Sequence, residues 1–284
     1  GDFIGLSGNI IKTKTGELSI LVKELKLLSK SILPLPEKWH GLQDKEERYR
    51  KRYLDLIMNP EVKKVFDARQ KVFDYVREFL KSRGFQEVQT PVLQPIYGGT
   101  NAKPFESKLN ALDMKVYMRI SNEMYLKRLI VGGYEKIFEF SPDFRNEGID
   151  KLHNPEFTQV ETMWAYADYE DNMKLWPEMI EYVVKKIHGK TRIKCGGNEI
   201  DFKAPWKKLK FSDALKSHAK VSMSEVKNLA DAKKTAKKIG VEADKCDSID
   251  EVMLSIFEEL VQPKLIQPTL VYDYPKEAAI LAKG

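Results

Sequence analysis

Residues 136–167 read KIFEFSPDFRNEGIDKLHNPEFTQVETMWAYA, and this stretch decides how we interpret the fold. Its two halves, about 136–147 and 156–167, have the alternating apolar and polar residues that are typical of β-strands. The segment between them contains glycine, aspartate, asparagine and proline, which favour a loop. The sequence therefore predicts a long antiparallel hairpin.

One face of this hairpin collects residues that can bind charged ligands. Side chains alternate along a strand, so the odd-numbered residues of both strands share a face. Arginine suits phosphate or carboxylate, a phenylalanine ring can stack on a base, and carboxylates accept hydrogen bonds from ammonium groups. The same pattern also fits a surface ion pair beside a core phenylalanine, so the pattern alone leaves both interpretations open. The face would carry Asp143, Arg145, Glu147, Phe157, Gln159, Glu161 and Met163, with His153 and Asn154 on the loop at its rim.

Outside the hairpin the sequence predicts helices and short strands. A helix follows Asn59 as N-cap and ends at Gly84, and another runs from Asp168 to Gly189, where Pro177 should bend or restart it. Strands that neighbour one another as hairpins, with helices outside, indicate an α+β fold on an antiparallel sheet rather than a parallel doubly wound one. The other expected elements are strands at 85–93, 115–120 and 269–274, a short helix capped by Ser121, a hairpin around 195–198, and helices near 225–239 and 249–261, the last opened by a capping box at Ser248 and Glu251.

The first 35 residues have a pattern of their own. Two strands, about 3–11 and 16–23, are joined by a polar turn, and two strands alone cannot bury a core. They look like the last strands of a small β-barrel. The expected domains are a partial barrel at 1–35, a linker or connector at 36–59, and a main domain at 60–284 with a small helical insertion at about 205–265.

Composition narrows the class of protein. The 284 residues are 42% hydrophobic, enough for a sizeable core, and no apolar run approaches the roughly 20 residues that a bilayer needs, so no membrane partner is expected. Cys195 and Cys246 are far apart in sequence, which supports neither a disulfide framework nor a zinc site and fits a reducing cytoplasm. The net charge of +6 is spread along the chain; it is compatible with a nucleic-acid partner and does not decide for one.

Several motifs together resemble the class II lysyl-tRNA synthetases of subclass b. Residues 144–161, with Ala-Tyr-Ala-Asp-Tyr at 165–169, resemble motif 2 of this family, and the helix ending at Gly84 with residues 85–91 resembles motif 1. The family's motif 3 has no counterpart, so we expect the chain to be truncated at both ends. Further resemblance lies in the lysyl-type loop at 98–105, the family's connector at 41–56, and the opening strands, which look like the end of its anticodon-binding OB-fold barrel.

The resemblance implies a role for each candidate residue. Arg145 would be the catalytic residue, because it would bind the ATP α-phosphate and the amino-acid carboxylate and stabilise the charge that develops there. The other ATP-binding residues would be Phe157 on adenine, Glu147 and Asn154 at the polar edge of the base, and His153 at the outer phosphates. The amino-acid site would consist of Gly99, Glu123 and Glu161 around the α-ammonium, together with Arg145, and Met163 stands where the family usually has a tyrosine for the lysine ε-ammonium.

The implied reaction is activation of lysine with ATP and transfer to tRNA(Lys), in a homodimer formed through the motif 1 region. ATP and Mg2+ are implied, but the family's magnesium ligands would lie beyond residue 284, so no metal ligand is predicted and this chain alone is expected to be poorly active. Two alternatives stay open: a catalytically silent synthetase-like protein that binds tRNA or nucleotide, and a related ligase with altered amino-acid specificity, which Met163 prompts. The opening strands disfavour the paralogue that attaches lysine to an elongation factor.

Overall fold

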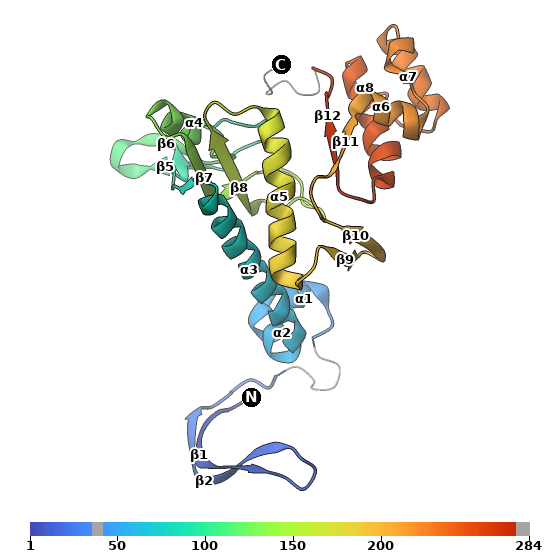
Figure 1. Cartoon of the computed structure of the whole chain (residues 1–284). Coiled ribbons are helices and arrows are strands. Elements are labelled where there is room, and N and C mark those ends of the chain that lie inside the picture. Colours follow the sequence, from blue (N-terminus) through green and yellow to red (C-terminus); the bar gives the residue numbers. More distant parts are fainter. Residues whose placement is uncertain (36–41, 277–284) are drawn as a thin grey trace. The chain divides into compact units, whose positions relative to one another are not determined.

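A computed structural model describes residues 1–35 and 42–276 of the chain (Figure 1). The chain divides into two units, Gly1–Lys71 and Val72–Gly284. In the first unit, β1 (Phe3–Lys12) and β2 (Leu18–Ser29) form the predicted antiparallel pair, with β2 longer than expected. Apolar side chains are exposed along both strands, including Phe3 at 67% and Leu18 at 75%. The pair therefore has apolar surface left to bury, and its assignment to an OB-fold barrel stays a prediction.

The second half of the connector predicted at 36–59 is helical, and its role as a connector stays a prediction. Helices α1 (Lys45–Arg50) and α2 (Arg52–Met58) occupy it, whereas residues 36–41 lie outside the described residues. Asp55 is buried between these helices and accepts hydrogen bonds from Arg48 Nε and Asn59 Nδ2, both at 2.7 Å, and from Arg52. A carboxylate with three such donors holds the two short helices together. Asn59 stands directly before α3, where the N-cap was predicted, and its amide nitrogen donates to Asp55 and to the Leu42 carbonyl.

The main sheet of the second unit contains the predicted hairpin. Strands β7 (Lys136–Phe144) and β8 (Glu156–Trp164) pair antiparallel, and β3 (Gln86–Glu87) adds to β7 in parallel. The strand predicted at 85–93 is wrong over its centre, because Thr90 donates its N–H to the side chain of Glu139 and not to a main-chain carbonyl of β7. Beyond Pro91 the chain joins a second sheet of β4 (Leu93–Gln94), β6 (Met114–Met118) and β5 (Glu106–Leu109), and the turn η1 (Asn110–Leu112) links the last two.

Two long helices cover one face of the main sheet. Figure 1 shows α3 (Pro60–Ser82) and α5 (Tyr169–His188) side by side against β7 and β8. The core between them contains Phe79 and Leu80 of α3, Phe138 of β7, and Met179 and Val183 of α5. The N-cap residue of the short helix α4 (Glu123–Val131) is Asn122 and not the predicted Ser121, which lies one residue earlier and whose Oγ accepts a hydrogen bond from the N–H of Glu123.

Helix α5 runs without interruption past Pro177, so of the two predicted effects of this proline, a bend or a restart, the restart does not occur. Proline removes one hydrogen bond of the helix, but tertiary packing and good ends outweigh this loss. Leu175, Met179 and Val183 are buried, and Gly189 ends the helix with a φ of 72°. At the start, Asp168 Oδ1 accepts from the N–H groups of Glu170 and Asp171, and the Asp171 side chain accepts from the N–H of Asp168.

The rest of the second unit has a hydrophobic core of its own. The predicted hairpin of β9 (Arg192–Cys195) and β10 (Asn198–Asp201) leads to β11 (Lys207–Lys210), which pairs with β12 (Thr269–Tyr272). This pair and β3–β7 are parallel, whereas the other strand pairs are antiparallel, and a helical crossover separates β11 from β12. The crossover consists of α6 (Phe211–Ala214), η2 (Leu215–Ala219), η3 (Met223–Glu225), α7 (Leu229–Lys238), α8 (Ile249–Ile256), η4 (Phe257–Val261) and η5 (Gln262–Lys264).

The crossover helices keep the predicted order; α8 begins at Ile249 as predicted, and the start of α7 is shifted. Helix α7 begins at Leu229, later than predicted, because the Asn228 side chain caps it by accepting from the N–H of Asp231. Ser248 caps α8 through the N–H of Glu251, but the Glu251 carboxylate accepts from Asp247, so only half of the predicted capping box forms. Buried residues such as Phe211, Met253 and Phe257 form the core of this crossover. The expected domain limits themselves stay predictions.

The cap of α5 gives a direct test of the fold. In Asp168→Ala the N–H groups of Glu170 and Asp171 lose their acceptor, so the free energy of unfolding should fall by about 1 kcal/mol. Urea unfolding followed by circular dichroism measures this change. Glu170→Ala removes an exposed acid of the same first turn that is not the cap, and an equal loss in both variants would contradict the capping role.

Candidate active site

The register of the hairpin places the predicted residues on one face. Asp143 lies opposite Phe157, and Glu139 opposite Glu161, so these odd-numbered residues share a face as predicted. Strand β7 ends at Phe144, however, which means that Arg145 and Glu147 lie in the loop and not in the strand. Arg145 nevertheless continues the pairing, because its N–H donates to the Pro155 carbonyl at 2.8 Å.

The arginine and the aromatic ring expected at this site lie together. The guanidinium carbon of Arg145 is 5.0 Å from the centre of the Phe157 ring, and Arg145 Nε donates to the Ile120 carbonyl at 3.4 Å. Both side chains are half-buried. A fixed cation beside a flat ring offers phosphate binding and base stacking within one short stretch of chain.

A set of hydrogen-bond acceptors forms the second part of the site. Glu161 Oε1 accepts from Ser121 Oγ at 3.0 Å and also from Gln159, while Ser121 Oγ accepts from the N–H of Glu123 at 3.1 Å. Gly99, with a φ of 95°, packs so closely that an added Cβ would lie 2.9 Å from Ser121 Oγ and 3.2 Å from Glu123 Cβ. Three segments distant in sequence therefore bring Gly99, Glu123 and Glu161 to one place, where two carboxylates could hold an ammonium group.

Charge and burial act together on this acceptor set. Burial raises the pKa of Glu161, and the charges on Asp143 and Glu123 add to this increase, whereas the hydrogen bond from Ser121 opposes it. Glu123 is paired with Lys127 one helical turn later. A bound cation would relieve the repulsion among the carboxylates, so the site favours a positively charged ligand.

The remaining candidates lie apart from these two groups. Met163 is half-buried opposite Ile137, two positions from Glu161 along the same face. Glu147 accepts from the N–H of Lys103 at 3.3 Å, His153 Nδ1 is 2.8 Å from Asp150 Oδ2, and Asn154 donates to the Glu156 carbonyl. Glu147, His153 and Asn154 are exposed on the loop. These contacts are made with Lys103, Asp150 and Glu156, not with the side chains of Arg145 or Phe157.

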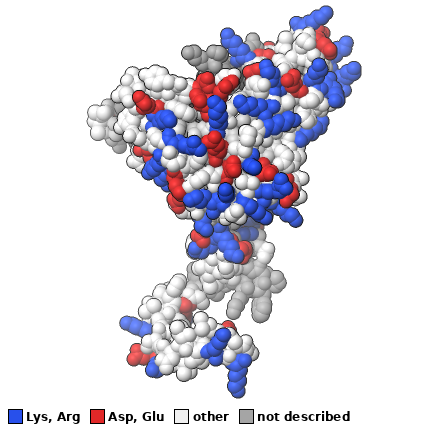
Figure 2. Space-filling view, viewed as in Figure 1, with Lys and Arg blue, Asp and Glu red and all other residues white. Residues whose placement is uncertain are grey.

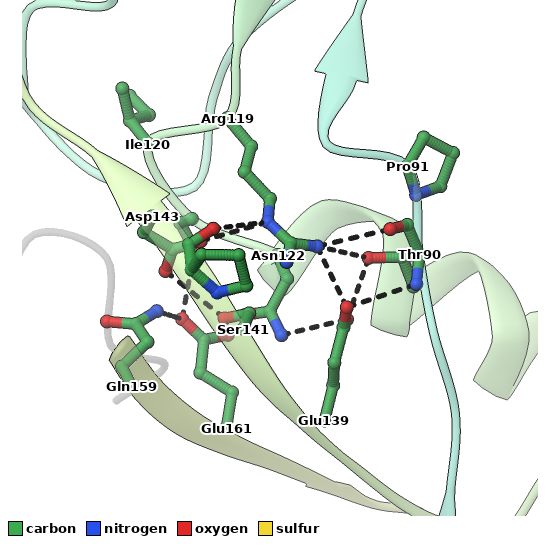
Figure 3. Close-up of polar contacts among 12 residues, drawn as sticks. Thr90, Pro91, Arg119, Ile120, Asn122, Glu139, Ser141, Asp143, Gln159 and Glu161 are labelled. Atoms are coloured by element: carbon green, nitrogen blue, oxygen red, sulfur yellow. Dashed lines mark hydrogen bonds and ion pairs between the residues drawn. The ribbon is translucent and has the colours of Figure 1, made fainter. Parts of the chain in front are cut away.

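Asp143 also belongs to a buried ionic network whose other charged members, Arg119 and Glu139, the sequence interpretation missed (Figure 3). Arg119, 2% exposed, pairs with Glu139 through Nη1 at 2.8 Å and with Asp143 through Nε at 3.1 Å. Glu139 also accepts from Thr90 Oγ1 at 2.7 Å and from Asn122 Nδ2 at 3.0 Å. The sequence does contain a signal for this network. In each of the two predicted strands a charged residue stands among apolar ones, in Tyr-Met-Arg-Ile at 117–120 and Ile-Phe-Glu-Phe at 137–140, which indicates a charge on a buried face.

Asp143 is the less satisfied carboxylate of this network. The single hydrogen on Arg119 Nε is donated to the Pro142 carbonyl at 2.9 Å, and Asp143 Oδ1 has no hydrogen-bond donor among the described residues. Asp143 therefore gains attraction from the guanidinium without a full hydrogen bond. Consistent with this, burial raises the pKa of Asp143 to about 6, against the opposing effect of Arg119.

The chain matches a known family of enzymes. An α+β fold with mixed strands and helices around this antiparallel hairpin is that of a class II synthetase domain. The family model described as tRNA synthetases class II (D, K and N) matches residues 44–284, and the chain belongs to this family.

Curated relatives that are about 50% identical in sequence align with the whole chain. It is 50% identical to "Lysine--tRNA ligase" of Clostridium novyi (strain NT) and of Pelotomaculum thermopropionicum, covering 100% of this chain and 56% of each relative. It is 51% identical to "Lysine--tRNA ligase" of Thermoanaerobacter sp. (strain X514), where it covers 57% of the relative. The chain thus spans a little over half the length of the curated relatives it matches.

The raised pKa of Asp143 predicts how stability depends on pH. Between about pH 4 and 6 the folded protein holds the Asp143 proton more tightly than the unfolded chain does, so stability falls as the pH rises through this window. In Asp143→Asn this fall is absent, and the unfolding free energy of the variant relative to wild type should rise by up to about 3 kcal/mol from pH 4 to pH 7.

Urea unfolding of both proteins at the two pH values measures this difference, with Asp113→Asn as the exposed control. A difference between wild type and Asp143→Asn that stays the same at both pH values would rule out a titrating Asp143.

Proposed function

We propose that the protein to which this chain belongs activates lysine with ATP and transfers it to tRNA(Lys). The observation that carries this proposal is the identity of about 50% along the whole chain with three lysine--tRNA ligases. The family description names D and N beside K, so membership of the family does not by itself identify the amino-acid substrate. The two groups of residues on and beside the hairpin support the chemistry.

In this proposal Arg145 bridges the two substrates. Its guanidinium would bind the α-phosphate of ATP and the carboxylate of lysine, and Phe157 beside it would stack on adenine. Gly99, Glu123 and Glu161 would accept from the α-ammonium, which fixes the carboxylate for in-line attack on the α-phosphorus. The substrate carboxylate is the nucleophile, so the chain positions the reactants and neutralises charge, and needs no nucleophilic side chain.

The loop residues would complete the nucleotide site. Glu147 and Asn154 would lie near the polar edge of adenine, and His153 near the outer phosphates. The contacts of Glu147 with Lys103 and of His153 with Asp150 support this assignment, because they hold a polar loop in one shape beside Arg145. The family relationship implies Mg2+ with ATP. Within 1–35 and 42–276 no group of three or more His, Cys, Asp or Glu residues could hold a metal ion, so we assign no step to magnesium.

Partners follow from the same proposal. Exposed apolar residues of α3, Val65 at 67% and Phe66 at 43%, support a homodimer through the motif 1 region. Lysines crowd over α7, at the upper right of Figure 2, while both signs of charge mix over the rest of the drawn face. This supports a polyanion such as tRNA as a partner. No helix of the described residues is long and apolar enough to cross a membrane, and we propose the cytoplasm as the place of action.

A second candidate function rests on Met163. A thioether is a weak acceptor and cannot replace a hydroxyl at an ammonium group. This observation favours either a ligase with altered specificity or a catalytically silent relative that still binds nucleotide or tRNA. Ligand binding separates these possibilities from the main proposal.

Binding of non-hydrolysable aminoacyl-adenylate analogues tests the function of this chain. The lysyl analogue should bind more tightly than the aspartyl and asparaginyl ones in isothermal titration calorimetry. Arg145→Ala should weaken binding at least about tenfold, because the phosphate loses a charge-assisted bond. Arg192→Ala, which removes an exposed arginine from β9, is the matched control and should bind as wild type does. Tighter binding of the aspartyl or asparaginyl analogue would overturn the lysine assignment.

Met163→Tyr tests the side-chain part of the site. A phenol hydroxyl can accept from the lysine ε-ammonium, so affinity for the lysyl analogue should rise by up to about tenfold, the equivalent of one charge-assisted hydrogen bond. The same calorimetry measures this gain, with Met114→Tyr on β6 as the control. Unchanged affinity in Met163→Tyr would show that this position does not read the lysine side chain.

A further inference from the structure

Arg119 and Ile120 make polar contacts with the last three residues of β7, Pro142 to Phe144, and with Arg145 after them. Arg119 Nε donates to the Pro142 carbonyl at 2.9 Å and lies 3.1 Å from Asp143 Oδ1. The N–H of Phe144 donates to the Arg119 carbonyl at 2.9 Å, and Arg145 Nε donates to the Ile120 carbonyl at 3.4 Å. One two-residue segment thus fixes the backbone that leads into Arg145, and the Arg145 side chain as well.

The same arginine is anchored on its other side. Its Nη1 donates to Glu139 Oε1 at 2.8 Å and to Thr90, whose carbonyl and Oγ1 lie at 3.2 and 3.3 Å. Asn122, which directly precedes Glu123, donates to the second oxygen of Glu139 at 3.0 Å. Arg119 and Glu139 therefore connect two parts of the site. One is the start of α4, with Glu123 of the acceptor set, and the other is the end of β7, which Arg145 follows directly.

The chemistry of this position requires arginine. Five N–H donors in a rigid plane allow Arg119 to contact Pro142, Glu139 and Thr90 in different directions at once. A lysine would retain the charge between Glu139 and Asp143, but its single ammonium cannot make the Nε bond to Pro142 and the Nη1 bonds to Glu139 and Thr90 together. Charge and geometry can thus be separated by one substitution.

We propose that Arg119 is a positioning residue, which holds Arg145 at a fixed place relative to Glu123 and Glu161 and thereby sets the spacing between the phosphate-binding and ammonium-binding parts of the site. Arg119 is buried at 2% exposure and is not itself a ligand-binding group. The inference rests on the proposed function for the role of Arg145, whereas the position of Arg145 can be measured without any ligand.

Arg119→Lys in the whole chain tests the proposal, with Arg77→Lys as the matched control. Arg77 also bonds a glutamate, Glu87, through Nε at 2.9 and 2.8 Å, but lies on the surface of α3. The first readout is the Nε–Hε NMR signal of Arg145 in the ligand-free protein. The second is the affinity for the lysyl-adenylate analogue, measured where urea titrations show each variant to be folded.

We expect Arg119→Lys to shift or broaden the Arg145 Nε–Hε signal and to weaken analogue binding at least about tenfold, whereas Arg77→Lys should change neither. An unmoved Arg145 signal in folded Arg119→Lys overturns the proposal, whatever happens to affinity, because a merely structural arginine would lower stability alone. A wild-type chain that binds no analogue counts against the proposed function, while the ligand-free signal still decides the role of Arg119.

A milder variant decides the matter if Arg119→Lys does not fold. Thr90→Val removes a hydroxyl that contacts Arg119 and Glu139 away from the Pro142–Phe144 end of β7, and keeps nearly the same volume. The Arg145 signal should move in the same direction by a smaller amount. No movement of that signal in folded Thr90→Val would overturn the proposal in this case.

Discussion

The structure around the site depends on how one buried arginine is neutralised. A charge removed from water is costly unless it is paired and hydrogen-bonded, and removing one partner of such a pair typically costs about 3–5 kcal/mol. Arg119 meets this requirement with Glu139, Asp143 and the carbonyls of Thr90 and Pro142. Because these partners come from separate segments, the demand for pairing fixes the loop before β4, the end of β6 and strand β7 relative to one another.

The buried network has more negative than positive charge, and this excess affects the neighbouring site. One guanidinium faces two carboxylates, and Asp143 receives the weaker contact, since the Nε hydrogen goes to Pro142. The surplus negative charge lies close enough to Glu161 to raise its pKa together with burial. Arg145 directly follows the end of β7, two residues after Asp143. A positive group and a negative group of the site are thus held on one rigid framework, which suits a zwitterionic amino acid.

Local patterns in the sequence correctly predicted the helices and strands that local interactions stabilise. Alternation gave the hairpin and its shared face, and capping residues gave helices α5 and α8. The errors lie where distant contacts decide: the strand at 85–93 is interrupted because Thr90 bonds to Glu139, 49 residues away. Arg119 was missed for the same reason, since no local pattern reveals its partners. The gathering of Gly99, Glu123 and Glu161 was expected from family resemblance and not from spacing, because three separate segments supply them.

The two faces of the hairpin explain why the site tolerates so much buried charge. The even-numbered residues Phe138, Phe140, Val160 and Trp164 pack in the core with α3 and α5, and this apolar burial stabilises the strands. The odd-numbered face is then free to carry Glu139, Asp143 and Glu161 against Arg119 and Ser121. A shift of one residue in register would exchange the faces, burying carboxylates in an apolar core and leaving Arg119 unpaired. The apolar core therefore fixes the register, and the register in turn aligns the charges of the site.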